Sequence, residues 1–337
     1  MARPRPASLA DIARAAGVSA QTVSRVANGS DSVRPETAAK VREAMRTLGY
    51  RPSFAGRSLK QGRYRTVGLA MFNNITATGN IFRLDGITRA ATEAGCALTL
   101  IEMDCTDHAT LTSAAERLSA LPVDGMIFNL TRPAENFLDF KPLAGLPMVI
   151  ITNLEHPLCP TVDNDQLGCS HTIVDHLLDL GHRTVFHVAG KEESIASRLR
   201  EQGWREALVA RGVEPPPLLR GDWSGMSGYE AGAHLAAIPE CTAIYASNDA
   251  MALGVVDALN DAGRRVPEDV SVVGVDDSLA TVLPHDRITS LRFDNRAVGR
   301  WAFEHAMAEA APQGDTPAHC LMPGTLIQRE SVAPPAR

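Results

Sequence analysis

The chain has 337 residues, of which 45% are hydrophobic and 21% are charged, and its net charge is −6. That length exceeds one small core and predicts about two or three folding units, and no apolar run is long enough to span a bilayer. Residues 1–65 hold 13 Lys and Arg against 4 Asp and Glu, a net +9 that leaves −15 on the remainder; this basic arm on an acidic body predicts a polyanionic partner for the arm.

The six cysteines are scattered along the chain, with no C-x-x-C pair and no histidines at metal-ligand spacing. We therefore expect reduced, mostly buried thiols, no metal site and no cofactor. Residues 1–6 lack the apolar core of a signal peptide. The sequence thus favours a cytoplasmic protein that contacts no membrane.

The first predicted elements are two short helices joined by a glycine turn. Ser8 and Asp11 have the spacing of a capping box at the start of the first helix. Gly17 ends that helix, and Ser19 is placed to cap a second one that runs over residues 20–27. Apolar residues recur at helical spacing in both, so the segment predicts a helix-turn-helix.

The second helix leaves a short polar face outside this core, formed by Ala20, Gln21, Ser24 and Arg25. Such a face can enter the major groove of DNA and meet base edges. A third helix begins near Pro35, and its apolar stripe is expected to close a three-helix core. That stripe comprises Val41, Ala44, Met45 and Leu48.

After the third helix, residues 53–59 form a potential short helix that a basic, polar linker follows at 60–65. A turn and a half of isolated helix should not be stable alone. Three ordered motifs here resemble the headpiece and hinge of the lactose-repressor (LacI/GalR) family: residues 11–26, then Gly49–Pro52, then Arg57–Leu59.

The resemblance implies that Ala20, Gln21 and Arg25 read bases in operator DNA, with Arg25 suited to a bidentate contact with guanine. It also implies that Leu59 is inserted into the minor groove and kinks the operator. Gly56 stands where that family usually has alanine, so we expect a hinge helix that depends on DNA and on its dimer mate to fold. The candidate DNA-binding residues are Ser19, Ala20, Gln21, Thr22, Ser24, Arg25, Asn28, Arg57 and Leu59.

From residue 66 onward, buried strand patterns alternate with helical patterns, and the rhythm restarts after Pro160. This predicts an α/β unit of two lobes, with parallel sheets covered by helices and a ligand cleft at the carboxyl ends of the strands. The resemblance implies the same two-lobe, periplasmic-binding-protein-like domain beside an all-α headpiece. The expected divisions are a headpiece at 1–50, a hinge at 51–65, a first lobe at 66–162 with about 292–320, and a second lobe at 163–291 with about 321–333, with residues 157–162 as one bridge.

Polar residues that follow strand candidates are expected to reach the ligand. Carboxylates and amides bind sugar hydroxyls, an arginine offers a fork of donors, and an indole ring offers a stacking face. The resemblance implies Arg200, Trp223, Asn248 and Asp276 as effector ligands, although Asn248 and Asp276 could be helix caps only and Trp223 plain core. Asp163 and Asp165 compete for one family position. The candidate effector residues are Asn73, Phe82, Asp165, Arg200, Trp223, Asn248 and Asp276.

The sequence therefore predicts a sequence-specific transcription regulator, a repressor that binds a pseudo-palindromic, double-stranded operator and responds to a small-molecule effector, with a sugar favoured. A sugar-binding module and a sugar-acting enzyme are the alternatives, but nucleophile-elbow, P-loop and dinucleotide motifs are missing from the sequence. The chain ends without an appended leucine heptad, which favours a homodimer over a tetramer. Which effector binds, and whether it releases or recruits the operator, stays open.

Overall fold

The computed structural model describes residues 7–27, 30, 32–50, 62–72, 75–76, 78–103, 110–134, 136–308 and 318–336. It divides into two compact units, Met1–Arg65 and Thr66–Arg337. Four predicted site residues lie outside the described residues: Asn28, Arg57, Leu59 and Asn73.

The N-terminal unit contains the three predicted helices, α1 (Leu9–Ala16), α2 (Ala20–Ala27) and α3 (Pro35–Thr47). Ser8 and Asp11 form the expected capping box on α1. Ser19 caps α2, because its Oγ accepts a hydrogen bond of 3.1 Å from the backbone N–H of Thr22. Local sequence chemistry thus sets where these helices begin.

One apolar cluster holds the headpiece together, with Ile12, Val23 and Val41 fully buried at its centre. The expectation for Leu48 is wrong, because its side chain is 42% exposed. Helix α3 ends at Thr47, so Leu48 leaves the buried stripe, and Tyr50 packs against the cluster instead.

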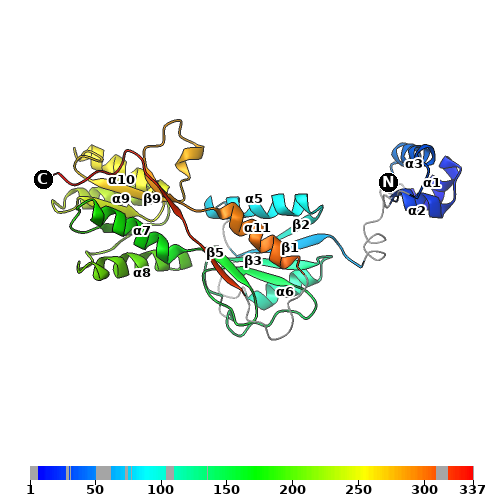
Figure 1. The fold of residues 1–337 in the computed structure, drawn as a ribbon, viewed down its shortest axis with the longest axis horizontal. Coiled ribbons are helices and arrows are strands. Elements are labelled where there is room, and N and C mark those ends of the chain that lie inside the picture. Colours follow the sequence, from blue (N-terminus) through cyan, green and yellow to red (C-terminus); the bar gives the residue numbers. More distant parts are fainter. Residues whose placement is uncertain are drawn as a thin grey trace, which may run out of the picture. The chain divides into compact units, whose positions relative to one another are not determined.

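The first lobe is built on a six-stranded sheet in which all strand pairs are parallel, in the order β11-β5-β4-β3-β1-β2. Helices α5 and α11 pack on one face of this sheet and α6 on the other (Figure 1). Its elements are β1 (Thr66–Phe72), α5 (Thr78–Glu93), β2 (Ala97–Met103), α6 (Leu111–Ser119), β3 (Gly125–Leu130), β4 (Met148–Ile151), β5 (Thr161–Asn164), α11 (Asn295–Ala306) and β11 (His319–Met322).

The second lobe has a sheet of order β12-β10-β9-β8-β6-β7, parallel except for the β10–β12 pair at one edge. Helices α7 and α8 cover one face and α9 and α10 the other. Its elements are α7 (Gln166–Asp179), β6 (Phe186–Ala189), α8 (Ile195–Ala210), β7 (Leu219–Arg220), α9 (Gly225–Ala236), β8 (Ala243–Ala246), α10 (Asp249–Asp261), β9 (Ser271–Val275), the 3-10 helix η1 (Leu279–Thr281), β10 (Thr289–Arg292) and β12 (Thr325–Ile327). The predicted α/β fold is confirmed.

Strand β5 corrects the expected course between the lobes. Residues 157–162 are not the bridge: they lead into β5, so Asp163 and Asn164 belong to the first sheet rather than to the start of the second lobe. Within the described residues the chain crosses between the sheets after β5, after β10 and between β11 and β12. The sequence pattern hides β5, because three of the four residues of this short buried strand are polar.

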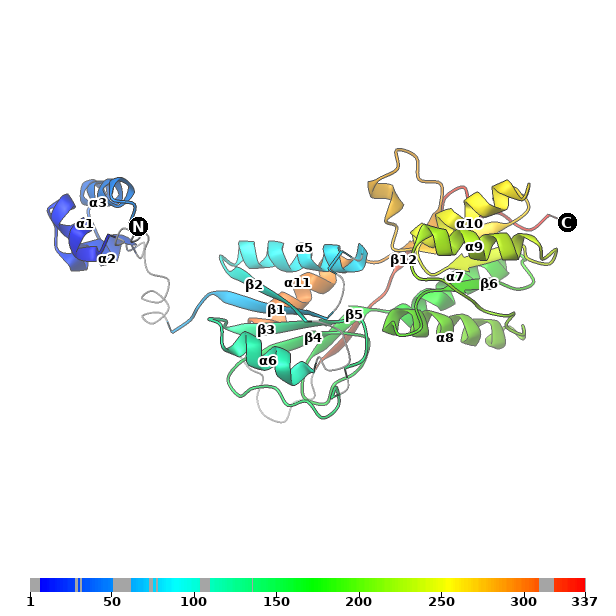
Figure 2. The same ribbon diagram turned by 180° about the vertical axis from the view of Figure 1, so that it is seen from behind.

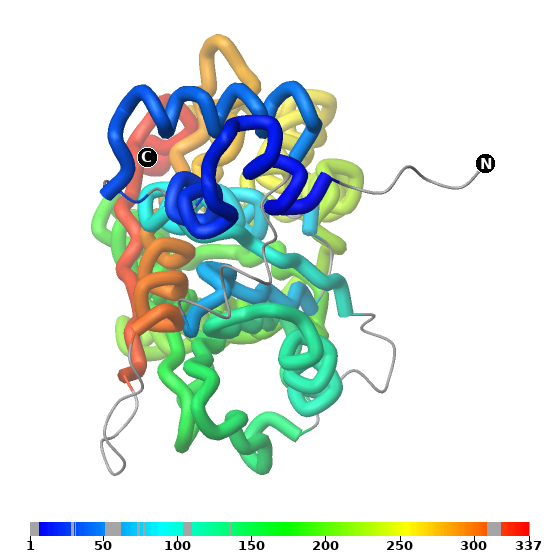
Figure 3. Tube along the Cα trace, turned by 90° about the vertical axis from the view of Figure 1, so that its right-hand side faces the viewer, coloured from blue at the N-terminus to red at the C-terminus, as the bar shows by residue number. Residues whose placement is uncertain are grey.

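A pair of glycines lets α5 and α11 approach each other closely, side by side in two further views (Figures 2 and 3). A Cβ atom on Gly86 would lie 2.2 Å from the carbonyl oxygen of Arg296, and one on Gly299 would lie 2.1 Å from that of Arg83. No other residue type fits without moving a backbone. The start of α11 is thereby held against the first turns of α5.

The cysteines at 96, 159, 169, 241 and 320 are free thiols, and burial raises the pKa of Cys159, Cys169 and Cys241 to about 12. Helices of the described chain are all too short or too polar to cross a membrane.

Candidate functional site

The outer face of α2 has the polarity that the sequence predicts. Ala20, Gln21 and Arg25 are exposed, and Ser24 is half-buried. Val23 and Val26 point into the headpiece core, so the polar face is fixed in orientation by the apolar one. Ser19 and Thr22 hydrogen-bond to each other through their hydroxyls at 2.9 Å, at the start of the helix.

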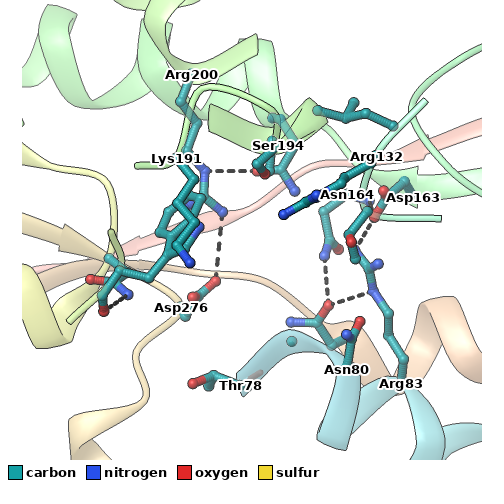
Figure 4. A pocket seen from close by; sticks show the side chains of 18 of the residues that line it. Thr78, Asn80, Arg83, Arg132, Asp163, Asn164, Lys191, Ser194, Arg200 and Asp276 are labelled. Carbon is teal, nitrogen blue, oxygen red and sulfur yellow. Dashed lines mark hydrogen bonds and ion pairs between the residues drawn. The ribbon is translucent and has the colours of Figure 1, made fainter. Parts of the chain in front are cut away.

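Between the two lobes lies a cleft of about 450 Å³ at the carboxyl ends of the strands (Figure 4). Side chains from both lobes line it, and most of them are polar. The lining includes Asn80, Arg83, Thr131, Arg132, Asp163, Asn164, Gln166, Lys191, Glu193, Ser194, Arg200, Asp222, Trp223, Asn248, Asp276 and Asn295. Four predicted effector residues, Arg200, Trp223, Asn248 and Asp276, are therefore brought together in one cavity.

Arg200 is the buried cation of the second lobe, with a relative exposure of 4%. Its Nε donates to Gln166 Oε1 at 2.8 Å, and its Nη1 donates to the carbonyl of Ser247. Its Nη2 lies 3.7 Å from Asp276 Oδ1 (Figure 4). Burial opposes the charge, but the acidic groups around the guanidinium, Asp276 foremost, together outweigh burial and raise the pKa of Arg200. The guanidinium plane is thus fixed before any ligand arrives.

Trp223 and Asn248 form a second fixed pair on the same wall. Asn248 Oδ1 caps α10 by accepting from the N–H of Met251 at 2.8 Å, while its Nδ2 donates to the carbonyl of Trp223 at 2.9 Å. The indole ring lies against Gly190, where an added Cβ would come within 2.3 Å of it. Asn248 is therefore both a helix cap and a cleft residue, and Trp223 packs on the core while it faces the cleft.

Two predicted effector residues lie off the cleft. Asp165 caps α7 through the N–H of Gly168 at 2.8 Å, and the carboxylate that lines the cleft is Asp163. The ring of Phe82 packs under the guanidinium of Arg296, with 4.8 Å from Cζ to the ring centroid. Because α5 already begins at Thr78, Asn80 and Arg83, three residues apart on one helix face, reach the cleft instead.

The floor of the cleft in the first lobe is a buried polar network centred on Arg83. Its Nε donates to Asn295 Oδ1 at 3.1 Å, its Nη1 to Asn129 Oδ1 at 3.2 Å and its Nη2 to Asp163 Oδ1. Asn164 Nδ2 also donates to Asn295 Oδ1, at 2.8 Å. Asn129 Nδ2 in turn donates to Asn80 Oδ1 at 2.8 Å. Sequence reasoning missed this network, because Arg83 is separated by 80 residues from Asp163 and by 212 from Asn295.

Behind Asp276 lies a second carboxyl group, that of Asp249, which is only 1% exposed. It accepts hydrogen bonds from Ser290 Oγ at 2.5 Å and from the backbone N–H and Oγ of Ser278 at 2.5 and 3.0 Å. Burial, followed by the negative charge of Asp276, raises the pKa of Asp249 to about 7. The wall that carries Asp276 thus rests on a group that titrates near neutrality.

The lobes also touch directly at the mouth of the cleft. Arg132 Nη2, after β3 in the first lobe, lies 2.7 Å from Glu193 Oε1 in the second. The backbone N–H of Ile195, at the start of α8, donates to the carbonyl of Thr131 at 3.1 Å. These two contacts join the lobes beside the cleft.

Comparison with known proteins gives matches over both units. Residues 8–53 match the family model described as bacterial regulatory proteins, lacI family, and residues 174–332 match the periplasmic binding protein-like domain. The chain is 33% identical to the HTH-type transcriptional regulator CelR of Thermobifida fusca over 98% of this chain and 100% of that protein. It is 29% identical to the lactose operon repressor of Escherichia coli strain K12, over 98% of this chain and 92% of that one.

Solved structures agree. The Lac repressor dimer bound to operator and the anti-inducer ONPF matches with a TM-score of 0.82 at 26% identity, covering 98% of this chain and all of that one. The CelR–cellobiose complex matches with a TM-score of 0.67 at 32% identity and the same coverage. These findings confirm the family that the headpiece motifs indicate. The chain is a member of the lacI family, a DNA-binding transcription regulator with an effector-binding domain, and not an enzyme.

Proposed function

We propose that this regulator is a repressor that binds a pseudo-palindromic operator as a homodimer, and that a saccharide in the cleft controls it. The composition of the cleft wall is the observation that supports a saccharide as the class of effector. Within the described lining, Trp223 is the one aromatic side chain, and it stands among hydrogen-bonding groups from both lobes. A sugar ring offers one apolar face to stack and a rim of hydroxyls to bind, which suits such a wall.

A flat aromatic heterocycle fits this wall less well, because it would be stacked on one side only and would leave many polar groups of the wall unpaired. Unpaired buried donors and acceptors cost about 1–3 kcal/mol each. The similarity to a regulator solved with cellobiose supports the same choice of ligand class. The cleft volume of about 450 Å³ falls within the range of small-molecule pockets.

The operator part of the proposal rests on the exposed polar face of α2, with Arg25 at its end. Two such helices related by a two-fold axis would read two half-sites of a pseudo-palindrome. Similarity to a repressor solved as an operator-bound dimer supports the homodimer. Exposed apolar side chains on the second lobe, Met226 at 68% and Val282 at 70%, offer surface for that contact.

The test is a thermal-shift screen of the full chain against glucose, galactose, ribose, maltose, lactose and cellobiose, with adenine and guanine as the competing class. A sugar present at 100 times its Kd should stabilise the fold by about 2.7 kcal/mol. Operator affinity, measured by fluorescence anisotropy with and without that sugar, should then change, and by linkage the operator should change sugar affinity by the same factor. A shift with a purine base and with none of the sugars would reject the saccharide.

A further inference from the structure

We propose that Arg83, Asp163 and Asn295 form a second hydroxyl-binding subsite, which reads two adjacent hydroxyls of the effector from the first lobe. The inference rests on the proposed saccharide effector and deepens it. The subsite would require a vicinal diol at the end of the ligand opposite Trp223. Of its three residues the sequence weighs only Asp163 for the effector, as the alternative to Asp165.

The three side chains are buried and still line the cleft. Their relative exposures are 8% for Arg83 and 5% each for Asp163 and Asn295. Figure 4 shows Arg83 and Asp163 on the first-lobe side of the cavity, across from Arg200 and Asp276. Both lobes therefore place a buried cation beside a carboxylate at the same cavity.

An inventory of donors and acceptors shows what this network leaves for a ligand. Asp163 Oδ1 accepts from Arg83 and from the backbone N–H of Asn164 at 2.8 Å, whereas Oδ2 has no partner among the described residues. Asn295 Oδ1 accepts from both Arg83 and Asn164, whereas its Nδ2 donates to no atom of the described chain. Neither unpaired atom is fully enclosed, and both residues line the cleft.

The arginine adds further donors. A guanidinium carries five N–H groups, and three of those of Arg83 are used within the described network. The remaining two have no acceptor there. The floor of the first lobe therefore presents a carboxylate acceptor beside amide and guanidinium donors.

This combination matches the chemistry of a diol. Each hydroxyl donates one hydrogen bond and accepts up to two, so one hydroxyl can donate to Asp163 Oδ2 while its neighbour accepts from Asn295 Nδ2. A ligand without a hydroxyl at this end would leave the carboxylate oxygen unpaired, and sites built to bind a hydroxyl discriminate strongly against analogues that lack it.

The network is also held in place before binding. A buried ion pair often stabilises a fold less than apolar side chains of the same volume would. Stability of the core therefore does not account for Arg83 and Asp163. The close packing of α5 on α11 at Gly86 and Gly299 fixes Arg83 relative to Asn295. Preorganised donors lose little freedom when a ligand arrives.

The test uses two substitutions of Asn295, one of which exchanges only its Nδ2 atom. Asn295→Asp retains an oxygen to accept from Arg83 and Asn164 but replaces the donor Nδ2 with an acceptor, whereas Asn295→Ala removes both. Each variant is titrated calorimetrically with whichever of the six named sugars stabilises the wild type most. We expect affinity to fall about tenfold or more in both variants, as loss of a good hydrogen bond predicts. The melting temperature should fall less in Asn295→Asp than in Asn295→Ala.

The matched control is Asn136→Asp. It makes the same chemical change in the first lobe, but Asn136 lies outside the cleft lining, where its Oδ1 accepts from the backbone N–H of Leu111 at 3.1 Å and its Nδ2 donates to Thr112 Oγ1 at 2.9 Å. It should change sugar affinity by less than about threefold, well under the 1.4 kcal/mol of a tenfold change.

Deoxy analogues of the same sugar supply the second measurement. The wild type should lose about tenfold in affinity when either of two adjacent hydroxyls is removed. For the analogue that lacks the hydroxyl bound by Asn295, the Asn295→Asp variant should bind the deoxy sugar and the parent sugar with equal affinity. Unchanged sugar affinity in both Asn295 variants would overturn this subsite. If Trp223→Ala abolished binding at the same time, the saccharide proposal would stand without it. If none of the six sugars bound the wild type, both proposals would fall together.

Discussion

The outer face of α2 presents exposed polar side chains on a small helical core. The floor of the cleft, by contrast, presents polar side chains that are almost fully buried and hydrogen-bonded to one another. Each arrangement suits its proposed target. Contacts with the charged DNA backbone orient the protein, so the base-reading side chains can remain exposed to solvent until DNA binds. A small ligand has no such backbone, so the side chains of its site must be held in position before it binds.

The largest effect that follows from this contrast is expected at Arg25. Arg25→Ala should lower the preference for operator over random DNA by about 2–6 kcal/mol in a dimer, since one bidentate guanine contact is worth about 1–3 kcal/mol. Anisotropy titrations with both DNAs at fixed salt measure the preference. Arg14→Ala is the control, because its side chain is 80% exposed on the neighbouring helix α1. Preference retained without Arg25 would contradict the assignment of this residue to base reading.

A somewhat smaller effect is expected from the buried carboxyl group of Asp249. Its pKa in the fold, about 7, lies above the value of 3.8 for an exposed aspartate. Between these pH values the folded protein holds a proton that the unfolded chain has lost, so its contribution to stability is complete at low pH and is lost as the pH rises through about 7. The upper bound is about 4 kcal/mol.

Comparison with Asp249→Asn isolates this contribution. The free energy of unfolding of the variant minus that of the wild type should increase from about pH 4 to pH 7 and stay level above pH 8. Burial lowers the pKa of several histidines, which affects both proteins equally and cancels in the difference; they are His156, His176, His182 and His187. Urea unfolding across this range gives the measurement. A level difference throughout would mean that the carboxyl of Asp249 ionises normally in the fold.

A third effect, of about 1–3 kcal/mol, is expected from overpacking the cleft floor. Gly86→Ala places a methyl group against the carbonyl of Arg296 and must push α11 away from α5. Both stability and sugar affinity should fall, because Asn295 moves with α11. Gly68→Ala is the control, since its Cβ would meet the side chain of Leu118 at 3.1 Å on the opposite face of the sheet and should lower stability alone. If Gly86→Ala lowered only stability, the position of α11 would not set the geometry of the site.

The same contrast explains what the sequence could predict. Helix caps are local, so Ser8, Ser19 and the polar face of α2 follow from neighbours a few residues away. The second-lobe residues Arg200 and Trp223 come from family motifs. Asp163 and Arg83 become a pair only when distant segments meet, and a strand that ends in Asp-Asn has no apolar pattern to reveal it. Whether Leu48 is buried depends on the exact residue at which α3 ends, and a sequence pattern does not predict a helix end to within one residue.

The smallest effect is expected at the mouth of the cleft, where Arg132 and Glu193 join the lobes. Their side chains are 43% and 46% exposed, and ion pairs in such positions contribute about 0–1 kcal/mol. Replacing either by alanine should therefore speed release of the bound sugar by no more than about fivefold, and the exchanged pair Arg132→Glu with Glu193→Arg should restore the slower rate.

Stopped-flow dissociation of the sugar from the wild type, both single variants, the double alanine variant and the exchanged pair completes a double-mutant cycle. A coupling energy near 0.5 kcal/mol would agree with an exposed pair whose charges water already screens. A coupling above about 2 kcal/mol exceeds what exposed pairs provide. The contacts at the mouth would then hold the lobes together, and the cleft would resemble the outer face of α2 in relying on exposed side chains.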